Sequence, residues 1–400
     1  MLSLPARPFA TFQRAEFEVR IERLRAEMEQ ERLDALLLTT EANFRYVTGF
    51  DSPTWVSPTR PFFCVLPLVG EPCAIIPTGS AVVMAATSWV SDVRTWPAPV
   101  PEDDGVSLVA GALAEAGGRF GRIGAELGPE LQLRMPALDF MRLRERVAPA
   151  AIVDGGMVTR RVRMVKSAGE VARIEQAAQI VSAAFEGLPG IVTAGASERE
   201  VCAALRIDLL RRGADATPYL TVCSGRGGYG TINTGPTERR LASGDVLILD
   251  TGTQVDGYFC DFDRNFAVGE APSAAWRELS ERLHRALEAG MAAAAPGARC
   301  KDVWLAMARV LGEEEVRRAD VGRMGHGVGL VLTEPPSIHP NDETMLVPGM
   351  VLAIEPGLGF DQPDGRKCVL VHEENVVVTE TGCRLLSRRA PLETPVIPLG

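Results

Sequence analysis

Three aspartates in one short stretch of the sequence could bind a cation together. The stretch reads DTGTQVDGYFCDFDR, and its candidate ligands are Asp250, Asp261 and Asp263. Apolar runs on both sides of the polar connection predict a β-hairpin. The separations from Asp250, 11 and 13 residues, are odd, so a hairpin with an even loop turns all three carboxylates to one face. Their repulsion must be compensated, either by arginines such as Arg264 or by a divalent metal.

Three residues further along the chain have side chains that suit a metal. His326 lies between glycines in MGHGVGL, where the imidazole can project from a tight loop. Glu355 follows the apolar run VLAI, and Glu373 interrupts another apolar run in LVHEENVVVT. The side chain of a glutamate at such a position points into an apolar core, which is unfavourable unless a cation or hydrogen bonds stabilise its charge. With Asp250 and Asp261 they form four carboxylates and one imidazole, the set expected for one or two Mn, Co, Fe or Zn ions.

The surrounding pattern predicts the elements that must position these residues. Spaced apolar residues predict an amphipathic helix over 11–33, and FFCVLPLVG and PCAIIPTG predict a hairpin. Ser167, with Glu170 three residues later, predicts the capped start of a long helix. Helices and hairpins are mixed, which indicates an α+β fold. We expect two domains, residues 1–158 and 159–400. Further helices are expected over 197–213 and 273–294, and strands over 34–40, 245–252, 258–268, 349–357 and 367–379.

Composition excludes several classes of protein. The 400 residues carry a formal net charge of -10 and no block of lysines or arginines, so the chain lacks the electrostatic footprint of a nucleic-acid binder. No apolar run approaches the roughly eighteen residues of a membrane span. The first residues are interrupted by charges, unlike a secretion signal, so we expect a cytoplasmic protein. The eight cysteines form no CxxC pair, which fits reduced and mostly buried thiols.

At these motifs the chain resembles a known family. DTGTQVDGYFCDFDR, GHGVGL, IEPG and HEENVVVT, in this order, resemble the metal-binding motifs of the creatinase, prolidase and aminopeptidase P branch of the methionine-aminopeptidase superfamily. MVKSAGEVARIEQAAQI resembles the helix that opens the catalytic domain of that branch. The resemblance covers the whole chain and implies a smaller creatinase-like N-terminal domain followed by a catalytic domain with the pita-bread fold.

The resemblance also implies a dinuclear metal site and a hydrolytic mechanism. The matched positions would bind two divalent ions, with Mn²⁺ expected first and Co²⁺, Fe²⁺ or Zn²⁺ as alternatives, and Asp261 and Glu373 would bridge them. Two cations lower the pKa of a water between them and polarise the carbonyl under attack. Glu355 would accept the proton of that water and pass it to the leaving nitrogen. The implied ligands are Asp250, Asp261, His326, Glu355 and Glu373.

The substrate side of the site departs from the family pattern. Asn233 and Thr333 stand where peptidases of this branch usually carry histidines that bind substrate and stabilise the oxyanion. Both can donate a hydrogen bond, but neither can carry a positive charge. Val371 stands where an arginine often precedes the last glutamate, and Asp263 stands where a threonine is common. For Asp263 we favour an ion pair with a nearby arginine over a role at the metals.

Three more residues are weaker candidates for substrate contact. His339 lies in a Pro-rich loop, PPSIHPND, near the motif that carries His326. Similar enzymes are homodimers in which the segment YVTGFDSPTWVSPTRPFF of one subunit reaches the active site of the other. Trp55 and Arg60 are therefore candidate substrate contacts; the alternative is that Trp55 packs in the domain core and Arg60 is solvated.

Three functions remain open from the sequence. The first is an Xaa-Pro dipeptidase or aminopeptidase, which the filled metal-ligand positions favour. The second is a non-peptidase relative acting on a small molecule, either a creatinase-like amidinohydrolase or a metal-dependent lyase, which Asn233 and Thr333 favour. The third is a binding protein without catalysis, but such relatives generally lose metal ligands. We expect a peptide or small-molecule substrate and neither a nucleic-acid nor a membrane partner.

Overall fold

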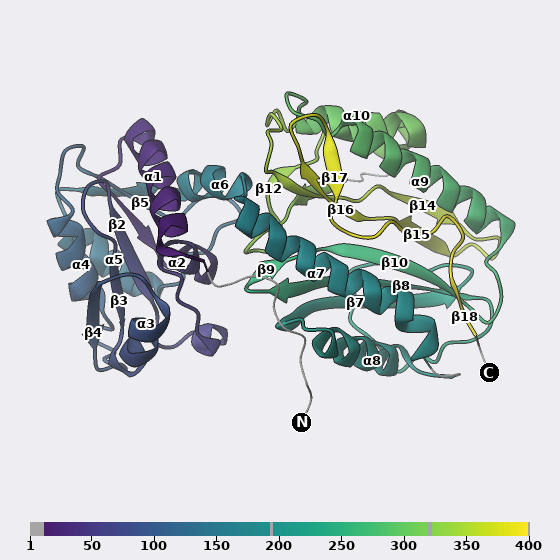
Figure 1. The fold of residues 1–400 in the computed structure, drawn as a ribbon, viewed down its shortest axis with the longest axis horizontal. Helices are drawn as coiled ribbons and strands as arrows, with labels where there is room; N and C mark the ends of the chain where they lie inside the picture. The colour runs from purple at the N-terminus through teal and green to yellow at the C-terminus, as the bar shows by residue number, and fades with distance from the viewer. Residues whose placement is uncertain (1–11, 193–194, 319–321, 399–400) are drawn as a thin grey trace. The chain divides into compact units, whose positions relative to one another are not determined.

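Two compact units make up the chain. The computed structural model describes residues 12–192, 195–318 and 322–398 (Figure 1). The division falls between Arg163 and Met164, inside helix α6 (Gly156–Met164), and the boundary expected from the sequence falls in the same helix. Among the described residues, no helix is both long and apolar enough to cross a bilayer.

The first unit is a mixed sheet with helices. Its strand order is β4-β3-β2-β1-β5-β6, and β2 and β3 pair antiparallel, as the hairpin prediction requires. Apolar side chains of the strands and of α4 and α5 form one core, which includes Leu37, Val65, Val109 and Leu143. The elements are α1 (Arg14–Glu31), β1 (Ala35–Leu38), α2 (Glu41–Thr48), β2 (Phe63–Pro67), β3 (Cys73–Pro77), α3 (Ala81–Thr87), β4 (Asp92–Trp96), α4 (Val106–Glu115), β5 (Arg122–Ala125), α5 (Ala137–Arg146) and β6 (Ala151–Asp154).

The second unit contains two larger sheets and a two-stranded ribbon. One sheet has the order β18-β10-β8-β7 with β9 paired to β8, the other has the order β12-β11-β13-β16-β17, and β14 pairs β15. The first half of the unit has α7 (Ala168–Gly187), α8 (Glu198–Arg211), β7 (Ala216–Arg226), β8 (Asp245–Val255), β9 (Tyr258–Phe259) and β10 (Phe262–Val268). The rest has α9 (Ala274–Ala293), α10 (Cys300–Leu311), α11 (Glu313–Arg318), β11 (Gly325–Gly327), β12 (Glu334–Ser337), β13 (Val351–Ile354), β14 (Gly357–Asp361), β15 (Lys367–Val371), β16 (Glu374–Val378), β17 (Cys383–Leu385) and β18 (Val396–Ile397).

Helix α7 shows how local sequence sets this architecture. Ser167 Oγ accepts a hydrogen bond from Glu170 N, and the Glu170 carboxylate accepts one from Ser167 N, so the predicted capping box is confirmed. Ile174, Ala178 and Val181 recur at helical spacing and are buried. This buried stripe lets α7 pack along β8, while α9 and α10 pack together over the second sheet (Figure 1).

Two long strands expected from the sequence are broken in the structure. The expected strand over 258–268 is interrupted between β9 and β10 at Cys260 and Asp261. The expected strand over 367–379 is interrupted between β15 and β16 at His372 and Glu373. Each break lies at a candidate ligand. At the second break the strand partner changes, since β15 pairs β14 and β16 pairs β13, whereas β9 and β10 on the two sides of the first break both pair β8.

The capping box of α7 gives a stability test. Ser167→Ala removes the side-chain acceptor of an otherwise unpaired backbone N–H, which typically costs about 1 kcal/mol. We expect the free energy of unfolding of the second unit, measured by urea titration, to fall by about that amount. Ser243→Ala, at an exposed position in the turn before β8, is the matched control. Equal effects of the two variants would contradict the capping role.

Candidate metal centre

The β8–β10 hairpin brings its aspartates together on one face. Asp250 on β8 lies directly opposite Asp263 on β10, and Asp261 lies two residues before Asp263, at the entry to β10. All three are buried. The other face of β10 carries Phe262 and Arg264, whose guanidinium carbon lies 4.7 Å from the Phe262 ring centroid. The hairpin and the shared face of Asp250 and Asp263, both expected from odd spacing, are confirmed.

His326 reaches the site from a strand that only glycines could flank. Gly325 has a φ of +147°, and a Cβ there would lie 2.3 Å from the Ala353 carbonyl oxygen. A Cβ on Gly327 would lie 2.2 Å from the Pro335 carbonyl oxygen. His326 Nδ1 lies 2.9 Å from the Gly327 carbonyl oxygen, which can only accept, so Nδ1 carries the proton of the neutral ring. The Nε2 lone pair is therefore free to bind a cation.

The two glutamates meet at the end of the β13–β16 ladder. The last pair of the ladder joins Ile354 to Glu374, so Glu355 and Glu373 are opposite each other one step beyond it. Their even separation, which an even-looped hairpin forbids, is produced by an odd loop: the β13–β16 and β14–β15 ladders keep one register, and the five residues 362–366 connect β14 to β15. Glu374, the next residue, faces away and pairs with Arg264 at 2.9 Å.

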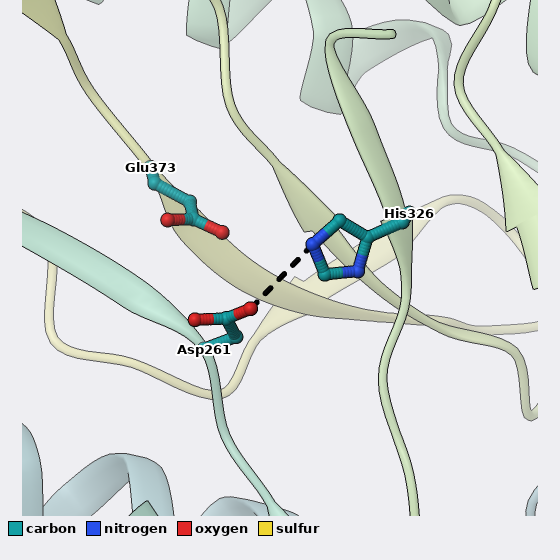
Figure 2. A group of neighbouring side chains, drawn as sticks. All are labelled: Asp261, His326 and Glu373. Atoms are coloured by element: carbon teal, nitrogen blue, oxygen red, sulfur yellow. Dashed lines mark ion pairs between the residues drawn. The ribbon is translucent and has the colours of Figure 1, made fainter. Parts of the chain in front are cut away.

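The candidate ligands converge on a small volume. One ligand atom from each of Asp261, His326 and Glu373 lies within 4.8 Å of the other two (Figure 2). His326 Nε2 is 3.5 Å from Asp261 Oδ2 and 3.8 Å from Glu355 Oε1. The side chain of Glu355 is 21% exposed, whereas Asp250 is 8% and Glu373 is 4% exposed. Glu355 is therefore the member of the set that solvent and substrate can reach best.

Three neighbours of the site were missed from the sequence. Tyr219 Oη donates a 2.8 Å hydrogen bond to Asp250 Oδ2. Asn375 accepts from Asp261 N at 2.9 Å and donates to Asp261 O at 2.6 Å, which ties the entry of β10 to β16. Arg323, exposed just before β11, lowers the pKa of Glu355 and of Asp261 by its charge, although burial outweighs this effect. The signal that could have indicated Asn375 is a polar side chain inside the apolar run ENVVV.

Burial dominates the electrostatics of the cluster. It raises the pKa of Asp250 to about 6 and, together with the Asp250 charge, raises the pKa of Glu355 to about 7. Burial and then the Asp250 charge raise the pKa of Asp261 well above its usual value. The pKa of Glu373 is raised in the same way by burial and then by Asp261. Burial lowers the pKa of His326 to about 4, so the ring is neutral at neutral pH.

The interpretation that arginines compensate the aspartates is wrong for Arg264. Its guanidinium donates to Glu374 Oε2 at 2.9 Å and to the backbone oxygens of Asp263 and Glu373. Within the described residues, both side-chain oxygens of Asp263 are buried without a hydrogen-bond partner, and no ion pair of Asp263 is present. The ion pair that we favoured for Asp263 is therefore contradicted. One oxygen each of Asp250, Asp261 and Glu373 is likewise buried without a hydrogen-bond partner among those residues.

The predicted substrate residues have varied surroundings. Asn233 is exposed between β7 and β8, and Thr333 is half-buried directly before β12. His339 Nδ1 accepts a 3.2 Å hydrogen bond from Asn341 N, which gives this ring a role in its own turn. Their contact with substrate stays a prediction.

In the first unit, the two candidates differ. Trp55 is 7% exposed, with its ring centroid 4.7 Å from that of Phe62 and 4.8 Å from the Arg134 guanidinium carbon. The alternative that Trp55 packs in the domain core is confirmed, because the neighbouring side chains cover the indole. Arg60 is exposed with a positive φ of 60°, and its role stays a prediction.

Two histidines behind the site, His284 and His372, are buried. The rings of His284 and His372 lie 4.2 Å apart, and His372 Nε2 is 2.8 Å from Ser280 Oγ. Burial lowers the pKa of His284 to about 4, so this ring is neutral at neutral pH. A cavity of about 260 Å³ beside His372 and Arg264 contains none of the five candidate ligands in its lining. The chemistry therefore does not lie in that cavity.

Comparisons with known proteins identify the family of the chain. Residues 172–380 match the model of metallopeptidase family M24, and residues 20–165 match the creatinase/prolidase N-terminal domain. The chain belongs to metallopeptidase family M24. A probable dipeptidase PepE of Mycobacterium tuberculosis is 30% identical over 92% of this chain and 93% of its own length. An Xaa-Pro dipeptidase of Pyrococcus furiosus is 29% identical over 58% of this chain and 65% of its own length.

Solved structures of M24 relatives share both units. Dipeptidase PepE from Mycobacterium ulcerans has a TM-score of 0.81 and 30% identity, and the match covers 98% of this chain and 100% of the relative. An Xaa-Pro dipeptidase from Bacillus anthracis has the same TM-score at 23% identity, over 95% of this chain and 99% of the relative, which shows the fold alone. The α+β fold with a creatinase-like N-terminal domain and an M24 pita-bread domain is thus confirmed.

Membership in M24 sets the general chemistry of the chain. The protein is a metal-dependent peptidase, with divalent metal ions as cofactor and a peptide as substrate. The buried oxygens without hydrogen-bond partners on Asp250, Asp261 and Glu373 and the free Nε2 of His326 fit such ions, because they are hard ligands that the described residues leave unpaired.

The raised pKa of Glu355 predicts a pH dependence of stability in the metal-free protein. At this carboxyl the folded state binds more protons than the unfolded state between about pH 4.5 and 7, so stability falls as pH rises. The lowered pKa values of His326 and His284 act in the opposite direction, but only below about pH 6.5. We therefore expect the Tm of chelator-treated protein to fall between pH 6.5 and about 8.

Glu355→Gln isolates this effect. The variant keeps the shape of the side chain and removes its charge, so its metal-free form should melt higher than the wild type at about pH 8. The difference should shrink toward about pH 5, where Glu355 is protonated in the folded wild type. A variant that melts lower than the wild type at about pH 8 would contradict the assigned burial of charge.

Proposed function

We propose that the protein is an Xaa-Pro dipeptidase or aminopeptidase with a dinuclear metal site. Asp250, Asp261, His326, Glu355 and Glu373 would hold the two ions, with Asp261 and Glu373 shared between them. One observation carries this proposal: ligand atoms of Asp261, Glu373 and the neutral His326 lie within 4.8 Å of one another, and Glu355 lies 3.8 Å from the imidazole. Asp250, Asp261 and Glu373 each have a buried oxygen without a hydrogen-bond partner among the described residues. Two divalent ions would balance the charge of four carboxylates, and Mn²⁺ is the ion to test first because the set is rich in oxygen.

The roles of the chain's own residues follow from their exposure and hydrogen bonds. Bound divalent ions would polarise the scissile carbonyl and make the attacking water more acidic. Glu355 is the most exposed member of the set, so it is the carboxylate that an attacking water can reach best. It would accept the proton of the attacking water at a carboxylate oxygen and pass it to the leaving nitrogen. Tyr219 and Asn375 would hold Asp250 and the entry of β10 in position.

The specificity for Xaa-Pro bonds rests on relatives that carry that name. Asn233, Thr333 and Val371 differ from the pattern expected for such peptidases, and the loss of one preorganised donor typically costs about a hundredfold or more in kcat. A non-peptidase activity on a small amide, guanidino compound or lyase substrate is the second candidate, which these replacements favour. His339 and Arg60 remain proposed substrate contacts, and we propose a cytoplasmic homodimer as the assembly.

The experiment is hydrolysis of Xaa-Pro dipeptides and longer Xaa-Pro peptides by chelator-treated protein with and without added Mn²⁺. We expect cleavage before proline only with the metal, and the preferred peptide length separates dipeptidase from aminopeptidase. Verified metal binding without cleavage of any peptide would refute the Xaa-Pro assignment and favour the small-molecule alternative.

Two variants test the assigned roles. Asp261→Asn should abolish metal binding and activity together, because it removes a shared ligand. Glu355→Gln should retain part of the metal and lose turnover by about a hundredfold or more, because it removes the proton acceptor. Glu380→Gln, an exposed glutamate, is the matched control and should behave as the wild type. Retention of activity in both site variants would overturn the proposed site.

A further inference from the structure

Asp263 is a sixth candidate metal ligand, and it differs from the other five because no role has been assigned to it. It is 2% exposed and lies directly opposite Asp250 across the β8–β10 ladder. Side chains directly opposite on one face of an antiparallel pair have Cβ atoms roughly 5 Å apart. Asp263 therefore belongs to the carboxylate cluster by position.

Among the described residues, no side chain forms a hydrogen bond or an ion pair with the Asp263 carboxylate, and Arg264 acts on it only through its charge. Both carboxylate oxygens are buried without a hydrogen bond within the described residues. Arg264, its neighbour in sequence, donates to the backbone oxygen of Asp263 and directs its other bonds to Glu374 and to backbone on the far face. An isolated buried carboxylate costs several kcal/mol unless it is paired with a cation or protonated. Either a cation bound in the site or a proton must therefore neutralise the Asp263 carboxylate.

We propose that Asp263 is an additional carboxylate of the metal centre, which strengthens the binding of divalent cations beside Asp250. This inference rests on the proposed metal site and deepens it. With Asp263 the cluster has five carboxylates and one imidazole, a set that is harder and more negative than four carboxylates and one imidazole. Such a set favours oxygen-preferring ions such as Mn²⁺ over Zn²⁺.

The test is Mn²⁺ titration of the full chelator-treated protein by calorimetry at about pH 8, with Asp263→Asn beside the wild type. We expect the variant to bind Mn²⁺ about ten- to a hundredfold more weakly, the usual effect of removing a group that supports metal ligands. Its metal-free form should melt at the same temperature as the wild type or higher, because the substitution removes a carboxylate and not a bonded partner. Asp361→Asn, at an exposed position on β14, is the matched control.

These two readouts separate the proposal from its alternatives. Unchanged Mn²⁺ affinity in Asp263→Asn would overturn it, since Asp263 would then be a protonated or purely structural group. A metal-free variant that melts lower than the wild type would also overturn it, because that is the sign of a lost structural contact. Should Asp263→Asn fail to fold, Asp263→Thr makes the same test with another uncharged side chain. Asp261→Asn distinguishes failure of the whole site: it should lose Mn²⁺ binding even if Asp263 proves irrelevant.

Discussion

The repulsion among buried carboxylates is the constraint on which the catalytic unit depends. Asp250, Asp261, Asp263 and Glu373 are each less than a tenth exposed, and their pKa values are raised chiefly by burial. A fold that gathers these groups without a compensating charge loses stability as they ionise. The arginine within the hairpin, Arg264, donates its hydrogen bonds to Glu374 and to backbone oxygens, and we propose that cations bound in the site compensate the carboxylates.

The architecture meets this constraint by ending or breaking strands at the ligands. Asp261 lies at the break before β10, Glu355 follows the last residue of β13, and Glu373 lies at the break between β15 and β16. At such positions a side chain need not follow the strand pattern in which successive side chains point to opposite faces. The neighbouring hydrogen-bonded ladders still fix the backbone. The Asn375 amide joins the entry of β10 to β16 by two hydrogen bonds, so ligands from different sheets keep a fixed spacing.

Much of this arrangement could be predicted from sequence because it follows from local rules. The odd spacing in the hairpin gives the shared face of Asp250 and Asp263, and the Ser167 and Glu170 pair gives the start of α7. What could not be predicted depends on contacts between distant segments. Neither the odd loop between β14 and β15, which brings Glu355 opposite Glu373, nor the lack of an arginine hydrogen-bonded to the Asp263 carboxylate within the described residues can be read from spacing.

The burial of His284 likewise could not be predicted from its local sequence. His284 has the sequence surroundings of an exposed helical residue, yet it is buried against His372, which lies at the break between β15 and β16 nearly ninety positions away. Residue type and helical period say how a side chain is oriented on its own element but not what packs over it. The family resemblance supplied the ligand roles, whereas only the assembled sheets show which of those side chains lie within reach of one ion.

The most direct test of the central claim is the anomalous diffraction of crystals grown with Mn²⁺, recorded on both sides of the manganese absorption edge. The account predicts two peaks in the carboxylate cluster, both within coordinating distance of Asp261 and Glu373 and one of them also next to His326. A map with no peak among these residues, at Mn²⁺ concentrations that saturate binding in solution, would contradict compensation of the buried charge by metal.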